Sequence, residues 1–339
     1  MRYYCGIDLH AKQCFLCVID EEEKILLKKA LPNSLELIVQ LLGAFASKPS
    51  VAVESTLNWY WLVDGLQEAG YEVKLAHTLG LHMITGAKVK TDRRDALSLA
   101  RLLRLGAIPQ AYIYPKEKRP IRDLLRTRSR MVSLRANAYG TLRRILMQYG
   151  HSSAVIKKFA EEQICRHFDH PAIQASCQLE LERVRLYSRE IAILEDYILH
   201  TVADQPVFDL LQTIPGVGKI LALTIYYEVG DIGRFEDPRS FCSYSRVVPG
   251  AANSAGVVSR GKGSKQGNPY LKWAFTQAAL YAVRFNAGIR KFRQAHLARR
   301  RSKSRKIVSL SIVAHKLAIA AYYVIKGQEP FKQELMFGQ

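Results

Sequence analysis

Hydrophobic and polar positions follow two different periods along the first 114 residues. Short apolar runs rich in β-branched and aromatic residues predict buried strands. Stretches with apolar residues three or four positions apart predict helices. The expected strands cover 3–8, 13–19, 24–30, 51–54 and 72–76, and the expected helices cover 34–46, 59–69 and 93–105. Three opening strands followed by alternation predict an α/β domain over residues 1–114.

The remainder of the chain has mainly helical spacing. Leucines at helical intervals over 116–144, and alternating apolar and charged residues over 179–199, predict two long helices that form a coiled hairpin. An irregular stretch holding Pro171 is expected to link them. We assign residues 115–205 to this helical region and residues 206–339 to a third, helical domain.

Four carboxylates occupy positions from which they could come together in one site. Asp8 and Glu54 each end a predicted strand, where sites on α/β sheets form. Asp92 and Asp95 stand three apart at the start of a predicted helix, so both project from one face of its first turn. Acids there are also common helix caps, and this alternative stays open. Gathered carboxylates repel by about 4 kcal/mol per pair at roughly 4 Å and a dielectric near 20. A divalent cation removes that cost, and oxygen ligands suit Mg²⁺ or Mn²⁺ better than zinc.

The charge of the chain indicates a polyanionic partner. Fifty lysines and arginines against 30 acids give a formal charge of +20 and a pI near 9.7. Residues 116–144 carry ten of the cations, including Arg126 and Arg130, so a phosphate-facing surface is favoured over a merely solvated face. Residues 290–306 carry nine more and no acid, with three in a row at Arg299, Arg300 and Arg301. We expect this run to order only on nucleic acid.

Two glycine-containing segments add candidate phosphate contacts. A Pro-Gly-x-Gly turn between helical stretches is typical of a helix-hairpin-helix, in which Gly216, Gly218 and Lys219 would approach a phosphate. Such a turn can also serve only to pack two helices. The Gly/Ser-rich segment 248–269 contains no acid and is predicted to be a loop that closes on a nucleic-acid backbone rather than a flexible linker. Its cations are Arg260, Lys262 and Lys265.

Membrane and secreted classes are disfavoured. The chain opens directly into a strand with a candidate ligand, so we predict no signal peptide. Residues 307–325 are long enough to span a membrane, but His315 and Lys316 at their centre favour a buried core helix. Six cysteines without a disulfide or zinc spacing are expected to be reduced core thiols. We therefore expect a cytoplasmic, nucleoid-associated protein.

The order of these motifs resembles a known family. Five segments carry the resemblance: Gly6-Ile7-Asp8, Val53-Glu54-Ser55-Thr56, Thr91-Asp92-Arg93-Arg94-Asp95-Ala96, Ile214-Pro215-Gly216-Val217-Gly218 and Gly230-Asp231-Ile232-Gly233-Arg234-Phe235. Together they resemble the DEDD transposases of insertion-sequence family one-ten, a group that includes the DNA invertase Piv. The resemblance covers nearly the whole chain. It implies an N-terminal domain similar to the RuvC Holliday-junction resolvase, with an RNase H-like fold.

The resemblance also implies catalytic residues. Four metal-binding acids of the family match Asp8, Glu54, Asp92 and Asp95. Many relatives have Glu-Ala-Thr-Gly at the second acid, where this chain has Glu54-Ser55-Thr56-Leu57, so the family's turn is not carried over. A serine nucleophile in a loop after a proline matches Ser254, five residues past Pro249. Ser259 and Ser264 are the alternatives in the same loop.

The family recombines an element with target DNA under the guidance of a structured RNA. We expect Mg²⁺ held by the acids to orient a phosphate while Ser254 attacks it, in a dimer or tetramer whose sites assemble between subunits. A structure-selective nuclease would use the same acids with water as the nucleophile. A sugar-kinase or actin-like ATPase would need a second Gly-rich phosphate loop, which we do not find in the sequence. A non-catalytic nucleic-acid scaffold would need the basic surfaces but not the four acids.

Overall fold

The computed structural model describes residues 1–85, 92–151, 165, 168–202, 206–248, 251–254, 257–260, 266–299 and 304–337. It describes only the backbone at residues 82–85, 92–93, 251–254, 257–260, 335 and 337. The chain forms two compact units, Met1–Lys116 and Glu117–Gln339. The first boundary lies close to the expected residue 114, whereas the expected division at residue 205 stays a prediction.

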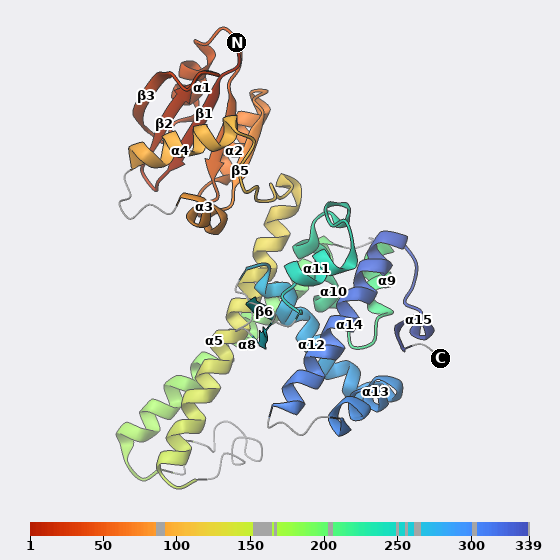
Figure 1. Cartoon of the computed structure of the whole chain (residues 1–339). Helices are drawn as coiled ribbons and strands as arrows, with labels where there is room; N and C mark the ends of the chain where they lie inside the picture. Colours follow the sequence, from red (N-terminus) through yellow and green to blue (C-terminus); the bar gives the residue numbers. More distant parts are fainter. Residues whose placement is uncertain are drawn as a thin grey trace. The chain divides into compact units, whose positions relative to one another are not determined.

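The first unit is built on a five-stranded mixed sheet of order β3-β2-β1-β4-β5 (Figure 1). The first three strands form an antiparallel meander, while β4 pairs in parallel with β1 and β5 in parallel with β4. This is the RNase H-like arrangement that the sequence resemblance implies. The strands are β1 (Tyr4–Leu9), β2 (Gln13–Ile19), β3 (Ile25–Pro32), β4 (Ser50–Glu54) and β5 (Val73–Ala76).

Helices cover both faces of this sheet. α1 (Leu35–Gly43) and α2 (Tyr60–Glu68) pack on the face to which Ile7 and Val53 point. α4 (Asp92–Arg104) packs on the opposite face, where Ala52 contacts its leucines. α3 (Thr78–Thr85) follows β5. Successive residues of a strand point to opposite faces, so the short apolar runs of the sequence bury both sides of the sheet.

Gly6 in β1 allows α4 to approach the sheet closely. A Cβ atom at this position would lie 2.0 Å from the carbonyl oxygen of Ala96 and 2.6 Å from the backbone nitrogen of Ala100. Both alanines are fully buried. The backbone of α4 therefore rests directly on β1, which fixes the helix next to the strand that ends in Asp8.

The second unit begins with two long antiparallel helices, α5 (Arg119–Gln148) and α8 (Pro171–Thr201). Leu146 packs with Cys177 at one end of the pair, and Leu125 packs with Ile198 at the other. The two long helices predicted from sequence are confirmed. Pro171, however, lies in the first turn of α8 rather than in the linking stretch, because proline suits a position whose N–H has no helical partner.

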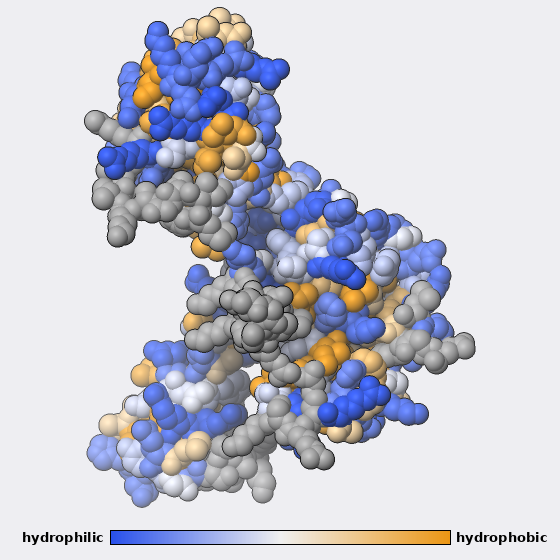
Figure 2. Space-filling model, viewed as in Figure 1, coloured by the Kyte–Doolittle hydropathy of each residue, from blue (hydrophilic) through white to orange (hydrophobic). Residues whose placement is uncertain are grey.

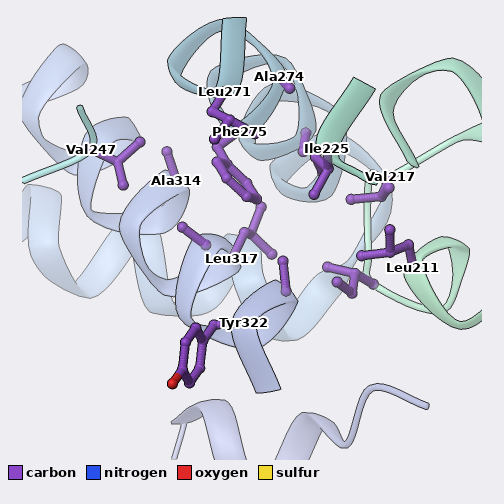
Figure 3. Packing of buried hydrophobic residues seen from close by; sticks show 14 of the residues in the cluster. Leu211, Val217, Ile225, Val247, Leu271, Ala274, Phe275, Ala314, Leu317 and Tyr322 are labelled. Carbon is purple, nitrogen blue, oxygen red and sulfur yellow. The ribbon is translucent and has the colours of Figure 1, made fainter. Parts of the chain in front are cut away.

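The rest of the second unit is a helical bundle around a large core. Phe275, Leu317 and Tyr322 are buried in this core (Figure 3). Phe241 is buried there as well. The elements of the bundle, with the short 3₁₀ turn that precedes α5, are η1 (Lys116–Lys118), α9 (Pro206–Gln212), α10 (Lys219–Val229), η3 (Ile232–Arg234), α11 (Pro238–Tyr244), α12 (Pro269–Phe285), α13 (Ala287–Ala298), α14 (Arg305–Gly327) and α15 (Gln333–Phe337).

Helix α14 holds the long apolar stretch of the sequence. By length and composition it could cross a membrane, but Val313, Leu317 and Ala321 are fully buried in the core of the bundle. The expectation of a buried core helix agrees with this packing. The six cysteines are free thiols, as expected, and burial raises the pKa of Cys14 to about 11 and that of Cys242 to about 12.

Two segments differ from the sequence expectation. Most of the basic run 290–306 is helical in the protein itself, in α13 and at the start of α14, so the expectation that it orders only on nucleic acid is wrong for those residues. The cause is apolar anchoring, because Ile289 is fully buried. The predicted loop 248–269 contains an antiparallel hairpin of β6 (Ala251–Ser254) and β7 (Val257–Arg260).

Candidate active site and nucleic-acid interface

Two of the four predicted acids lie side by side at one edge of the sheet. Ile7 of β1 pairs in parallel with Val53 of β4, and each is followed directly by an acid, Asp8 or Glu54. By the alternation of strand side chains, both acids share the face of Gly6 and Ala52, which is the face that α4 covers. The sequence pattern predicted the strand ends, and the parallel register makes them neighbours.

Asp95 lies at the same edge of the sheet because of the direction in which α4 runs. Arg104 at the end of α4 donates to the backbone oxygen of Glu21 and pairs with the Glu23 carboxylate in the β2–β3 turn. That turn lies at the N-terminal end of β1. The first turn of α4, with the half-buried Asp95, therefore lies at the opposite edge, where β1 and β4 end. Asp92 is the first residue of α4, and its side chain lies outside the described residues.

Asp8 is held in a buried and polar position. The residue is 3% exposed, and its Oδ2 atom lies 3.2 Å from Nε2 of His10. The backbone oxygen of His10 accepts hydrogen bonds from the side-chain amides of Asn33 and Asn58, which hold the turn after β1. Sequence reasoning missed His10. Its position two residues after a strand-ending acid was the available signal.

The described acids fit a hard divalent cation by their donor type. Asp8, Glu54 and Asp95 offer oxygen ligands only, at a common edge of the sheet. Among the described side chains, no group of three or more His, Cys, Asp or Glu residues is arranged to hold a metal. The fourth predicted ligand, Asp92, is the one whose carboxylate lies beyond that description.

The predicted nucleophile lies in the β6–β7 hairpin of the second unit. Ser254 is the last residue of β6 and pairs with Val257, while Ser259 lies in β7 opposite Ala252. The side chains of both serines and of Arg260 lie outside the described residues. Pro249, Lys262, Ser264 and Lys265 also lie outside them.

The predicted helix-hairpin-helix turn joins α9 to α10. Gly216 has a φ of +84°, and a Cβ atom there would lie 2.1 Å from the carbonyl oxygen of Ala278, so this glycine packs the turn against α12. Gly218 is the N-cap of α10 and provides no side-chain cap. A surface hollow of about 520 Å³ is lined by Gly218, the exposed Lys219 and Tyr281 of α12, among others. Both uses of such a turn, packing and access to an anion, are compatible with this geometry.

The predicted basic residues differ in their surroundings. Arg126 donates from Nε and from a terminal nitrogen to the carboxylate of Glu228, at 2.6 and 2.8 Å. This ion pair gives Arg126 a structural role that the charge pattern did not indicate. Arg130 is exposed on α5, and Arg299 is exposed at the end of α13. Arg300 and Arg301 lie outside the described residues.

Hydrophilic residues cover most of the surface visible in Figure 2.

Comparisons with known proteins match both parts of the chain. A protein-family model described as Transposase IS116/IS110/IS902 family matches residues 208–294. A second family model, described as Transposase and named for DEDD and IS110, matches residues 5–151. A putative transposase of Sinorhizobium fredii is 31% identical over 227 residues, which span 65% of this chain but only 55% of that protein. The transposase for insertion sequence element IS1111A of Coxiella burnetii is 26% identical over 96% of this chain and 90% of its own length.

Among solved structures, RuvC of Thermus thermophilus in complex with a Holliday junction substrate aligns with part of the chain. The identity is 17%, the TM-score is 0.26, and the alignment covers 33% of this chain and 100% of RuvC. A second RuvC structure from the same organism aligns with 18% identity and a TM-score of 0.25.

Proposed function

We propose that the chain is a transposase of the IS110/IS116/IS902 family and that it cuts and rejoins DNA strands at the ends of an insertion sequence. The observation that supports this activity best is the common sheet edge of Asp8, Glu54 and the first turn of α4. Cations held by carboxylates can stabilise the attacking and leaving oxygens when a phosphodiester is displaced. The charge of +20 suits a polyanionic substrate.

Asp8, Glu54, Asp92 and Asp95 are the proposed ligands of Mg²⁺, with Mn²⁺ as a substitute. The bound cation would supply charge stabilisation at the phosphate that reacts. The protein contributes a preformed edge, because Asp8 pairs with Phe15 of β2 and Glu54 with Ala76 of β5, so the sheet fixes the backbone at both acids before any ligand arrives. Nε2 of His10 lies 3.2 Å from one Asp8 oxygen, on the side of the β1–β2 turn.

Ser254 is the proposed nucleophile, an assignment that comes from the family resemblance. Its Oγ atom would form a bond to phosphorus while the bond from phosphorus to one bridging oxygen of the strand breaks. The hydroxyl proton passes to solvent or to a base, and the leaving oxygen takes up a proton. The phosphoserine link keeps the energy of the broken phosphodiester, so the strand can be rejoined to a new partner without ATP.

The nucleic-acid contacts of this proposal come from the second unit. Gly218, Lys219, Arg130 and Arg299 are exposed, and Arg260, Lys262, Lys265, Arg300 and Arg301 extend the set by sequence. The resemblance further implies a guide RNA, and recombination between two duplexes favours a homodimer or homotetramer. These partners are part of the proposal.

A denaturing gel tests the nucleophile directly. The full chain is incubated with Mg²⁺, RNA transcribed from the element and a plasmid that carries the element and its flanks. We expect wild-type protein and the Ser259→Ala variant to form a protein–DNA adduct, and Ser254→Ala to bind DNA but form none, because one hydroxyl contributes only about 1 kcal/mol to binding. Cleavage without any adduct would favour a structure-selective endonuclease. An adduct mapped by mass spectrometry to Ser259 or Ser264 would remove Ser254 from the role.

A further inference from the structure

The chain segment that carries Ser254 leaves the helical bundle through one stretch of backbone and returns to it through another, and the two stretches contact each other. We call this pair the loop neck, residues 244–248 and 266–268. The backbone N–H of Asn268 donates to the Tyr244 oxygen at 2.6 Å, and Nε of Arg246 donates to the Gln266 oxygen at 3.0 Å. Gly267 has a φ of +94°, and a Cβ atom there would lie 2.4 Å from the Tyr244 oxygen. The neck is therefore closed by direct backbone contact.

Asn268 connects the loop neck to two helices. Its side-chain oxygen accepts from the backbone nitrogens of Tyr270 and Leu271 at 2.9 and 3.1 Å, which caps α12. Its side-chain nitrogen donates to Glu228 of α10 at 2.7 Å. Asn268 is 4% exposed and Glu228 is 2% exposed, so both groups depend on these partners rather than on water.

Glu228 is in turn held by the long helix α5. Its two carboxylate oxygens accept from Arg126, whose guanidinium also lies 4.7 Å from the Tyr270 ring centre. Burial by itself lowers the pKa of Arg126, but its hydrogen bonds to Glu228 raise that pKa overall. The ion pair is charged, bidentate and largely enclosed. It ties α5, α10 and α12 together at the loop neck.

We propose that Glu228, Asn268 and Arg126 are positioning residues that fix the loop neck, and through it the segment that carries Ser254. The proposal rests on the proposed function of that serine. The physical argument is geometric: a nucleophile on a short hairpin is aimed only as well as the two chain ends that support it. A displacement of the order of 1 Å at a reacting atom can reduce a rate by about 100-fold. A buried, fully satisfied polar network is rigid enough to prevent such displacement.

A donor–acceptor exchange tests the network. Asn268→Asp keeps the oxygen that caps α12, because aspartate is an equally good N-cap, but it removes the donor to Glu228. One Glu228 oxygen accepts from both Asn268 and a terminal nitrogen of Arg126, and the other accepts from Nε of Arg126. Glu228→Gln replaces one of these two acceptors by an N–H donor, which then faces a donor of Arg126 or of Asn268. In the double variant, the Gln amide donates to the Asp carboxylate and its oxygen accepts from Arg126. The bond between positions 228 and 268 is restored with its direction reversed, and the bond from Nε of Arg126 is kept, whereas the bond from the terminal nitrogen of Arg126 is lost.

The matched control is Glu195→Gln, which loses a similar ion pair between α5 and α8, where Arg128 donates to Glu195 at 2.8 Å. We expect each single neck variant to form the adduct about 100-fold more slowly than wild type, with DNA binding retained. The double variant should regain most of the lost rate. Glu195→Gln should react like wild type.

Hydrogen exchange on the full chain without nucleic acid gives a second readout. Amides in the loop neck and at Tyr270 and Leu271 should exchange faster in the single variants and recover in the double variant. Should Asn268→Asp not fold, Glu228→Gln and the double variant still decide the question. Single variants that react at the wild-type rate, or a double variant no better than the slower single one, would overturn the positioning role. A wild-type protein that forms no adduct would instead overturn the proposed function itself.

Discussion

Asp8 and Glu54 differ from other acids of the first unit in where the backbone places them. Asp20 is also buried, at 5% exposure, but its carboxylate accepts from the backbone nitrogens of Glu22 and Lys24 and so stabilises the β2–β3 turn. That turn lies at the opposite end of β1 from Asp8. A buried carboxylate that serves a turn is part of the fold. One at the shared end of two parallel strands is available for chemistry.

Neutral amide substitutions at the sheet edge should therefore separate the two roles. We expect Asp8→Asn or Glu54→Gln to reduce Mg²⁺-dependent strand cleavage by about 100-fold or more, since one cation ligand is lost, while DNA binding persists. Asp20→Asn is the control, because its side-chain oxygen still accepts the turn hydrogen bonds. Cleavage rates in Mg²⁺ are the measurement. Near-normal cleavage by both edge variants would mean that the acids share no cation.

At the scale of elements, the close contact between α4 and β1 places the first turn of α4, with Asp95, at the sheet edge where Asp8 and Glu54 lie. Gly6 makes this contact possible, and Arg104 fixes which end of α4 faces which end of the sheet. A side chain at position 6 would push α4 outward and with it the turn that holds Asp95.

We predict that Gly6→Ala lowers the stability of the first unit by about 1–3 kcal/mol through overpacking, and that it lowers cleavage by more than the loss of folded protein explains. Gly43→Ala is the matched control, because Gly43 ends α1 and a Cβ atom there meets nothing within 4 Å. That change should be neutral or slightly stabilising. Thermal unfolding followed by circular dichroism measures both variants. A Gly6→Ala protein as stable and active as wild type would disprove the close packing.

At the scale of the whole molecule, the excess of 20 positive charges sets how binding responds to salt. Each phosphate neutralised on duplex DNA contributes about −0.9 to the slope of log K against log salt concentration. Replacement of Arg299, Arg300 and Arg301 by alanine should make this slope shallower. Replacement of Lys332, which pairs with Glu329, should leave it unchanged. Titrations at several salt concentrations decide, and equal slopes for all three proteins would mean that the arginine run faces solvent.

The proposed RNA partner makes a separate prediction for the whole molecule. The sequence contains no recognisable module for reading bases in the major groove, so protein alone should bind DNA with little sequence preference. Recombination of an element-bearing plasmid should require RNA from that element, and ribonuclease treatment should abolish it. Sequencing of nucleic acid that copurifies with the protein identifies the RNA. Site-specific recombination by RNA-free protein would refute the guidance.

The sequence by itself determined the features that depend on neighbouring residues. Alternation and β-propensity are local, so the strands that end in Asp8 and Glu54 could be predicted, as could the two long helices. Helical spacing likewise identified the buried helix α14. The hairpin around Ser254 was missed, because glycine and serine weaken the strand pattern there.

Only the tertiary structure decided which distant groups meet. The parallel pairing of β1 with β4 and the direction of α4 depend on contacts between segments far apart in the chain. Arg126 shows the limit most clearly. Its sequence surroundings indicate a phosphate-facing cation, but Glu228, 102 residues later, takes its guanidinium. The sequence shows how many charged side chains a segment carries, whereas the fold determines which of them pair with and neutralise each other.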